Sequence, residues 1–151
     1  IWGFGDLGIW GFGDLGIWKK DFKIKKFFTA PINMQSNKGP NLIVEITFSF
    51  SVSIVKYAEK LEAKRKYIIA RQLLKSGTSI GANVREAQNA ESKSDFVHKL
   101  KIAAKEADET EYWLMICKAS ENYPDCEDLL IEVQSIIRVL SKIIASSKGK
   151  V

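Results

Sequence analysis

Apolar residues recur at spacings of three and four from about Asn41 to Val151, and this pattern constrains the chain more than any other feature. The spacing matches the 3.6-residue turn of an α-helix and places the apolar side chains on one face. The pattern divides into four segments: about 41–62, about 64–90, a third from Ser92 or Ser94 to about Cys117, and a fourth from Pro124 onward. The sequence therefore predicts an all-α protein, an antiparallel up-down four-helix bundle with a poorly ordered N-terminal extension.

The first segment also carries the pattern of a strand. Apolar residues at positions 46, 48, 50, 52 and 54 alternate with serine or threonine. Such alternation is typical of a β-strand. Two observations favour a helix instead: the segment is longer than a typical strand, and Lys56, Lys60 and Lys64 continue the helical period. We therefore expect a helix here.

Two glycines interrupt the second segment. Gly77 and Gly81 each cost about 1 kcal/mol of helix propensity relative to alanine. Their spacing of four places both on one face, where the missing side chains allow another backbone to approach closely. The alternative is a kink or break near residues 77–79.

The first 33 residues differ in character from the rest. Residues 1–8 read IWGFGDLG, residues 9–16 repeat them, and the first methionine is Met34. The repeat contains the glycine spacing G-x-G-x-x-G twice, but that fingerprint binds dinucleotides only between a strand and a helix, and no strand precedes it. We expect residues 1–33 to be a repeat-containing extension that is disordered or not part of the native protein, and residues 34–151 to form the four-helix bundle.

The composition is that of an ordinary globular domain. Hydrophobic residues make up 46% and charged residues 27% of the chain, which argues against disorder as the dominant state. The longest apolar run, residues 42–55, is interrupted by polar residues and falls short of the ~20 residues of a membrane span. Cys117 and Cys126 lie near one predicted loop, so a disulfide is open to them, but two reduced thiols in a cytoplasmic protein are the simpler interpretation.

The sequence contains no evident constellation for catalysis. His98 is the single histidine, whereas a di-iron bundle needs a Glu-x-x-His pair on each of two helices and a zinc site needs more Cys and His ligands. No Walker A loop and no Gly-x-Ser-x-Gly elbow occurs. The acidic cluster from Glu106 to Glu111 is typical of a solvated face rather than an acid–base pair. We predict no catalytic, cofactor-binding or metal-binding residues, and a protein that is not an enzyme.

Charge is segregated along the chain, although the net charge is only +5. Residues 56–75 hold seven basic and two acidic residues, whereas residues 106–132 hold nine acidic residues and one basic residue. Complementary helices and solvated faces explain this pattern, but a basic surface at the first inter-helix loop also attracts nucleic-acid phosphates. The predicted nucleic-acid-binding residues are Lys60, Lys64, Arg65, Lys66, Arg71 and Lys75.

A polar set also lies on the packing side of the second segment. Buried polar groups need hydrogen-bond partners, and residues 109–112 of the third segment offer them. We expect a structural network or a subunit contact formed by Ser79, Asn83, Glu86, Glu109 and Tyr112.

The run LLKSGTSIGANVREA at residues 73–87 resembles the hallmark of the four-helix bundle family named for proteins encoded in 23S rRNA intervening sequences. The runs SKSDF at 92–96 and KEADETEYWL at 105–114 strengthen the resemblance, which covers about residues 41–147. It implies a four-helix bundle without catalytic residues. It also implies relatedness to the accessory variability proteins of diversity-generating retroelements, which are basic, form ring-shaped pentamers, and bind nucleic acid and a reverse transcriptase.

These observations together predict a non-enzymatic homo-oligomer, with a pentamer as the size that the resemblance implies, that binds RNA or DNA through the basic surface. The glycine pair and the aromatic pair Tyr112 and Trp113 favour an oligomer, because a small bundle needs a partner surface to bury them all. The alternative is a protein-interaction adaptor that docks a basic partner, such as a reverse transcriptase, on the acidic face of the third helix.

Overall fold

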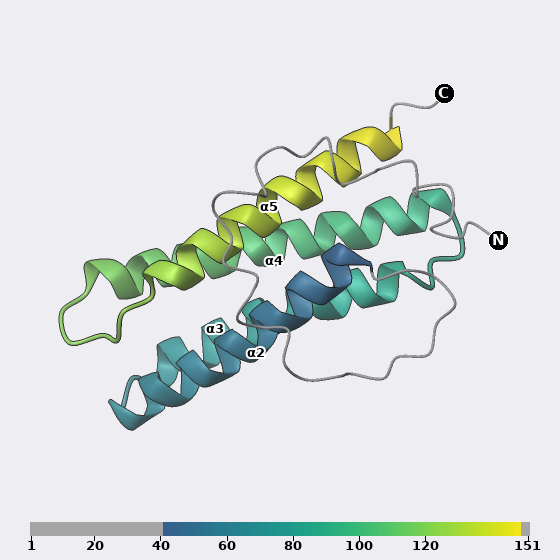
Figure 1. The fold of residues 1–151 in the computed structure, drawn as a ribbon. Coiled ribbons are helices and arrows are strands. Elements are labelled where there is room, and N and C mark those ends of the chain that lie inside the picture. Colours follow the sequence, from purple (N-terminus) through teal and green to yellow (C-terminus); the bar gives the residue numbers. More distant parts are fainter. Residues whose placement is uncertain (1–40, 149–151) are drawn as a thin grey trace.

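Four α-helices account for most of the described part of the chain, residues 41–148 of the computed structural model (Figure 1). They are α2 (Leu42–Ala63), α3 (Tyr67–Ala87), α4 (Lys93–Ala119) and α5 (Glu127–Lys148). No strand occurs within these residues, so the predicted all-α class and the four helical segments are confirmed. The extension predicted at residues 1–33 lies outside the described residues.

Helix α2 forms in spite of its strand-like alternation, because its buried side chains follow the helical period. Ile43, Thr47, Phe50, Ile54 and Leu61 are buried along one stripe. The hydroxyl of Thr47 donates to the carbonyl oxygen of Ile43 at 2.7 Å, and the Ser51 hydroxyl to that of Thr47 at 2.8 Å. Hydroxyls that bond back one turn are satisfied inside the helix, so the serine and threonine residues of this segment do not require a sheet.

Helix α3 runs without a break through its two glycines, which face α2. A Cβ placed on Gly77 would lie 2.8 Å from Cγ1 of Ile54, and one on Gly81 would lie 3.2 Å from the Thr47 carbonyl oxygen. The predicted close approach of a neighbouring backbone is therefore right, and the alternative break near residues 77–79 is wrong.

Two helix boundaries have clear local causes. Ser92 is the N-cap of α4, where its side chain accepts a hydrogen bond from the Asp95 backbone N–H at 3.1 Å. Helix α5 begins at Glu127, so Pro124 precedes the helix and does not lie in its first turn. The Leu130 N–H donates to the Cys126 carbonyl oxygen at 3.0 Å, whereas the Pro124 carbonyl oxygen accepts from the Tyr57 hydroxyl at 2.8 Å.

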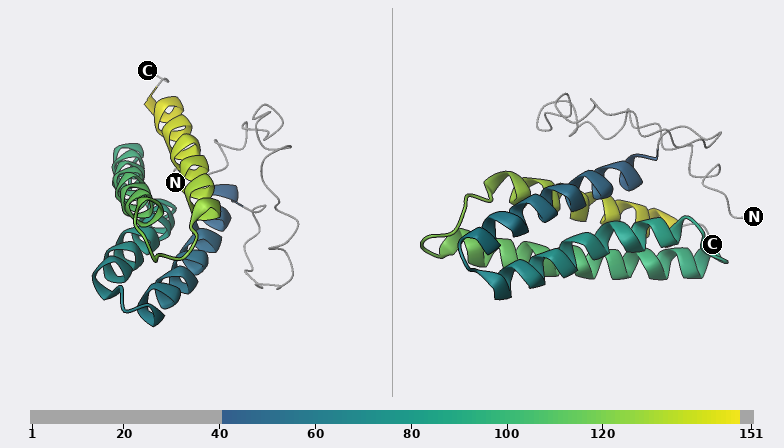
Figure 2. Two further views of the ribbon diagram at one scale, coloured as in Figure 1. Left: turned by 90° about the vertical axis from the view of Figure 1, so that its left-hand side faces the viewer. Right: turned by 90° about the horizontal axis from the view of Figure 1, so that it is seen from below.

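The helices run alternately up and down and form a closed bundle (Figure 1). Helix α2 packs on α3 and α5, and α4 packs on the same two helices; the contact between α2 and α5 is the least extensive. The connections at residues 64–66 and 120–126 lie at one end of the bundle, and the α3–α4 connection lies at the other (Figure 2). The largest fully buried side chains are those of Phe50, Ile54, Leu61, Leu73, Ile80, Leu100, Leu114 and Leu140. Among the helices described, none combines the length and apolarity needed to cross a bilayer.

A buried polar contact crosses between α3 and α4. The Thr110 hydroxyl donates to the Ser76 hydroxyl at 3.0 Å and also lies 2.7 Å from the Glu106 carbonyl oxygen, and both side chains are fully buried. Ser76 also donates to the Gln72 carbonyl oxygen at 3.0 Å. The contact fixes how the two helices face each other, because a buried hydroxyl without a partner is costly.

We expect Thr110→Val to lower the free energy of unfolding by about 1 kcal/mol, because valine keeps the shape of threonine but removes the contact to Ser76. Urea denaturation followed by circular dichroism measures the change. Thr78→Val is the matched control, since the Thr78 hydroxyl also bonds back one turn, to the Leu74 carbonyl oxygen at 2.6 Å. Equal losses in the two variants would contradict a role for the inter-helix contact.

Candidate nucleic-acid interface

The six predicted basic residues gather around the connection between α2 and α3. Lys60 lies in the last turn of α2, residues 64–66 form the connection, and Arg71 and Lys75 lie in the first half of α3. Lys66 is half-buried and the other five are exposed. None of the six forms an ion pair with a carboxylate among residues 41–148, where the ion pairs join Lys99 to Glu86 and Lys118 to Glu127. The charges of this basic surface are therefore not neutralised by described neighbours.

The turn that carries these residues is held in place by two contacts to the α4–α5 connection. The ammonium nitrogen of Lys66 lies 4.7 Å from the centroid of the Tyr123 ring, which is the geometry of a cation–π contact. Nearly two helical turns before the end of α2, the Tyr57 hydroxyl donates its hydrogen bond to the Pro124 carbonyl oxygen. Arg65 has a positive φ of 60°, the left-handed conformation that lets a short connection reverse the chain.

The same two contacts bring the acidic part of the chain to this end of the bundle. Glu121, Asp125, Glu127 and Asp128 lie in or just after the α4–α5 connection and are exposed. The two connections that carry these opposite charges therefore lie at the same end of the bundle, although they are far apart in the sequence (Figure 2). We name this end the loop end; it has a basic side on the α2–α3 hairpin and an acidic side on the α4–α5 hairpin. Up-down topology always places the first and third connections together, and that rule would have predicted the arrangement.

Two cysteines lie beside the same contacts. Cys117 and Cys126 are buried and free, and they line a small open pocket at the loop end together with Tyr123. Burial raises the pKa of the Cys117 thiol to about 11, and burial also raises the pKa values of Cys126 and Tyr57. The Cys126 thiol donates to the Leu114 carbonyl oxygen at 3.4 Å. Because only a thiolate is a strong nucleophile, these thiols behave as core groups.

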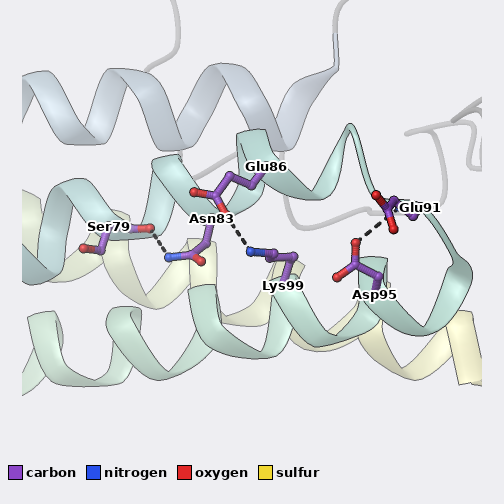
Figure 3. A network of polar contacts seen from close by, with 6 residues as sticks. All are labelled: Ser79, Asn83, Glu86, Glu91, Asp95 and Lys99. Carbon is purple, nitrogen blue, oxygen red and sulfur yellow. Dashed lines mark hydrogen bonds and ion pairs between the residues drawn. The ribbon is translucent and has the colours of Figure 1, made fainter.

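The five residues predicted to form a polar network do not join one another across α3 and α4 in the hydrogen bonds described. Asn83 donates to the Ser79 carbonyl oxygen on its own helix at 2.9 Å, and Glu86 pairs with Lys99 of α4 at 2.7 Å (Figure 3). Glu109 accepts a hydrogen bond from the indole N–H of Trp113 at 3.2 Å.

The remaining member of that set, Tyr112, is 61% exposed and packs its ring edge-on against Trp113. The polar contacts between α3 and α4 are instead those of Thr110 with Ser76 and of Lys99 with Glu86. Thr110 falls inside the apolar stripe of its helix, and a lone hydroxyl in such a stripe is a signal that a buried partner exists.

His98, the histidine considered above for a metal site, lies on α4. His98 is exposed, and Asp95 one turn earlier accepts a hydrogen bond from the Glu91 backbone N–H at 3.3 Å (Figure 3). Within residues 41–148, no three His, Cys, Asp or Glu side chains come together as a metal site.

Residues 41–148 thus form a small four-helix bundle with charged residues at one end. The sequence profile of the 23S rRNA-intervening sequence proteins matches residues 41–145, and the chain belongs to this family, as the resemblance predicted. A crystal structure at 1.70 Å resolution of a protein of unknown function from the S23 ribosomal protein family of Bacteroides thetaiotaomicron VPI-5482 is similar. It is 40% identical, with a TM-score of 0.65, and the match covers 68% of this chain and 97% of that one. No curated protein matches.

Proposed function

We propose that this chain is a non-enzymatic, cytoplasmic homo-oligomer that binds nucleic acid, RNA or DNA, through the basic side of the loop end. The observation that carries the proposal is the set of six cationic side chains around the α2–α3 connection, none of them paired with a described carboxylate. The name of the family, which refers to 23S rRNA, agrees with a nucleic acid as the partner.

Electrostatics decides how such a surface binds. Phosphates contact lysine and arginine and release counterions, which provides affinity without reading the base sequence. The acidic side of the loop end repels the same phosphates, so the strand follows the α2–α3 hairpin. Several copies in one oligomer would present several basic surfaces to one strand, and the effective local concentration would raise the overall affinity.

The test compares two full-length variants of equal net charge. The first carries Lys60→Gln, Lys64→Gln and Arg65→Gln at the loop end. We expect its affinity for a 20-nucleotide single-stranded RNA and for a duplex DNA of the same length to fall about tenfold. The slope of log K against log salt should become shallower by about 2 to 3, because three phosphate contacts are lost. Gel shifts at several salt concentrations measure both quantities.

The control carries Lys101→Gln, Lys105→Gln and Lys142→Gln, three exposed positions on α4 and α5 away from the α2–α3 turn. It removes the same charge, so it reports the long-range effect of net charge alone. Equal loss of affinity in the two variants, or no loss in either, would overturn the basic surface as the binding site.

A second candidate function is favoured by the acidic side of α4. Asp108 and Glu109 are exposed beside the exposed Tyr112 ring, and a surface of this kind would dock a basic protein such as a reverse transcriptase as an adaptor. The discriminating variant is Asp108→Asn with Glu109→Gln. Binding of a defined basic partner that survives nuclease treatment and is lost in this variant would support the adaptor, whereas intact nucleic-acid binding in the same variant would support the first proposal.

A further inference from the structure

Two large apolar side chains are exposed in the middle of the basic surface. Tyr67 is the first residue of α3, directly after the α2–α3 connection. Its side chain is 54% exposed, and that of Ile68 beside it is 77% exposed. Within residues 41–148 the Tyr67 hydroxyl has no hydrogen-bond partner. An isolated exposed apolar side chain is ordinary on a protein surface, so the meaning of this pair depends on its surroundings.

The charges around Tyr67 distinguish it from Phe48 and Tyr112, the other exposed aromatic residues in the described part of the chain. The four residues on either side of Tyr67 include four basic residues and no acidic one. The same window around Phe48 holds one acidic residue and no basic one, and that around Tyr112 holds three acidic residues and no basic one. Tyr67 is therefore the exposed aromatic ring that a polyanion would meet.

The helical period places Tyr67 and Ile68 beside a cationic side chain of the basic surface. Arg71 follows Tyr67 by four residues and Ile68 by three, and residues at these spacings are neighbours on the surface of a helix. All three are exposed, whereas Ala70 and Leu73 mark the side of α3 that faces the core. A nucleic-acid strand held by the Arg71 guanidinium therefore passes beside the Tyr67 ring.

Backbone hydrogen bonds hold the start of α3 in place. The Lys66 N–H donates to the Leu61 carbonyl oxygen at 2.9 Å, and the Ala70 N–H donates to the Lys66 carbonyl oxygen at 3.0 Å. A tyrosine side chain has only two rotatable bonds, so a flat ligand that stacks on Tyr67 meets a small ordering cost. The Tyr123 ring at the same end already carries the Lys66 ammonium on its face.

We propose that Tyr67, with Ile68 beside it, is a stacking platform for an unpaired base of a single-stranded nucleic acid. The inference rests on the proposed function and names the class of nucleic acid that the basic surface takes. The phosphates of the strand contact the surrounding lysine and arginine side chains, and one base lies on the Tyr67 ring.

Single strands fit this platform and duplexes do not. The bases of a duplex are stacked on one another and offer only their edges in the grooves, whereas an unpaired base offers its face to an aromatic ring. Stacking of this kind tolerates every base, so the platform selects single strands without reading a sequence. It does not involve the 2′-hydroxyl, the group that distinguishes RNA from DNA, so single strands of both kinds share the chemistry that Tyr67 recognises.

Tyr67→Ser in the full-length chain tests the inference. We expect its affinity for a 20-nucleotide single-stranded RNA, and for a single-stranded DNA of the same sequence, to fall about tenfold, because one stacked base is lost. The slope of log K against log salt should stay the same, since no charge is removed, and the affinity for a duplex of the same length should change less than about twofold. Tyr67→Trp should retain the affinity for both single strands. Fluorescence anisotropy titrations measure these constants.

An abasic strand and a matched variant complete the design. A 20-nucleotide abasic strand carries the same phosphates without bases, so Tyr67→Ser should bind it as tightly as the wild type does. Phe48→Ser removes another exposed ring, on α2, and should leave the affinity for all of these nucleic acids unchanged.

The outcomes separate this inference from the proposed function. Equal losses for single strand and duplex in Tyr67→Ser, a loss on the abasic strand, or no loss at all would overturn the stacking platform. If the variant with Lys60→Gln, Lys64→Gln and Arg65→Gln still loses affinity in that case, the basic surface stands as a site for phosphates alone. A wild-type chain that binds none of these nucleic acids would overturn both.

Discussion

Gly77→Val is expected to lower the free energy of unfolding by about 3 kcal/mol, because the new side chain has no room between α3 and α2. A Cβ at this position would lie 2.8 Å from Cγ1 and 2.9 Å from Cγ2 of Ile54, and Ile54 is fully buried. Gly77→Ala should cost about 1 to 2 kcal/mol, even though alanine gains about 1 kcal/mol of helix propensity over glycine. Urea denaturation followed by circular dichroism measures both losses.

A second-site substitution makes the prediction specific to the contact. Ile54→Ala removes the two nearest atoms that a Cβ at position 77 would meet and leaves only the Ile54 Cβ, at 3.3 Å. The expected cost of the cavity is about 3 kcal/mol. The double variant Gly77→Ala with Ile54→Ala should be less destabilised than the sum of the two single variants by about 1 kcal/mol or more. Ala82→Val, an exposed position on the same helix, controls for helix propensity. Additive losses would contradict steric crowding between α2 and α3 as the reason for glycine.

Glu132→Gln is expected to stabilise the protein by about 2 kcal/mol at pH 8 and to have little effect at pH 4. Burial, together with the nearby Asp128 carboxylate, raises the pKa of the Glu132 carboxyl from 4.5 to about 7. One pKa unit corresponds to about 1.4 kcal/mol, and we discount the total because the side chain is partly exposed. Glutamine mimics the neutral carboxyl, so it removes the cost of a buried charge above pH 7.

The sign follows from proton linkage. In the unfolded chain Glu132 loses its proton near pH 4.5, whereas in the folded chain it keeps the proton until about pH 7. Its contribution to stability is therefore complete below pH 4.5 and is lost as the pH rises through 7. Unfolding by urea between pH 4 and pH 8 measures the difference between wild type and variant. Glu59→Gln, an exposed position on α2, should show no such pH dependence; a parallel response in the two variants would contradict the burial of Glu132.

The α2 segment shows what sequence patterns settle and why. The alternation of apolar residues with serine and threonine favours a strand, whereas the length of the segment favours a helix. The structure confirms the helix. The helical stripe prevails because it supplies a buried residue at almost every turn, and because Thr47 and Ser51 satisfy their hydroxyls on carbonyls of the same helix. The glycine pair allowed either a close approach or a break, and the structure shows the close approach, with α3 continuous through both glycines.

The candidate interface was predicted only in part. The sequence identified the cluster of cationic residues, because lysine and arginine in and around a short connection are exposed in almost any fold. The predicted up-down order already implies that the acidic connection lies at the same end, but the sequence did not reveal that Lys66 stacks on Tyr123. The predicted polar network had the right helix in α3, but the partners across the interface are Lys99 and Thr110, since the rotation of two packed helices decides which side chains meet.

The amino-acid sequence by itself determined the helices, the apolar stripes that bury them and the family. These features are local or periodic, and each depends on residues that are close along the chain. Only the tertiary structure decided which charges are neighbours, which hydroxyls pair between helices and which apolar side chains are left on the outer faces. Those properties depend on how the helices are rotated and paired, and that arrangement is fixed by the packing of the whole core at once.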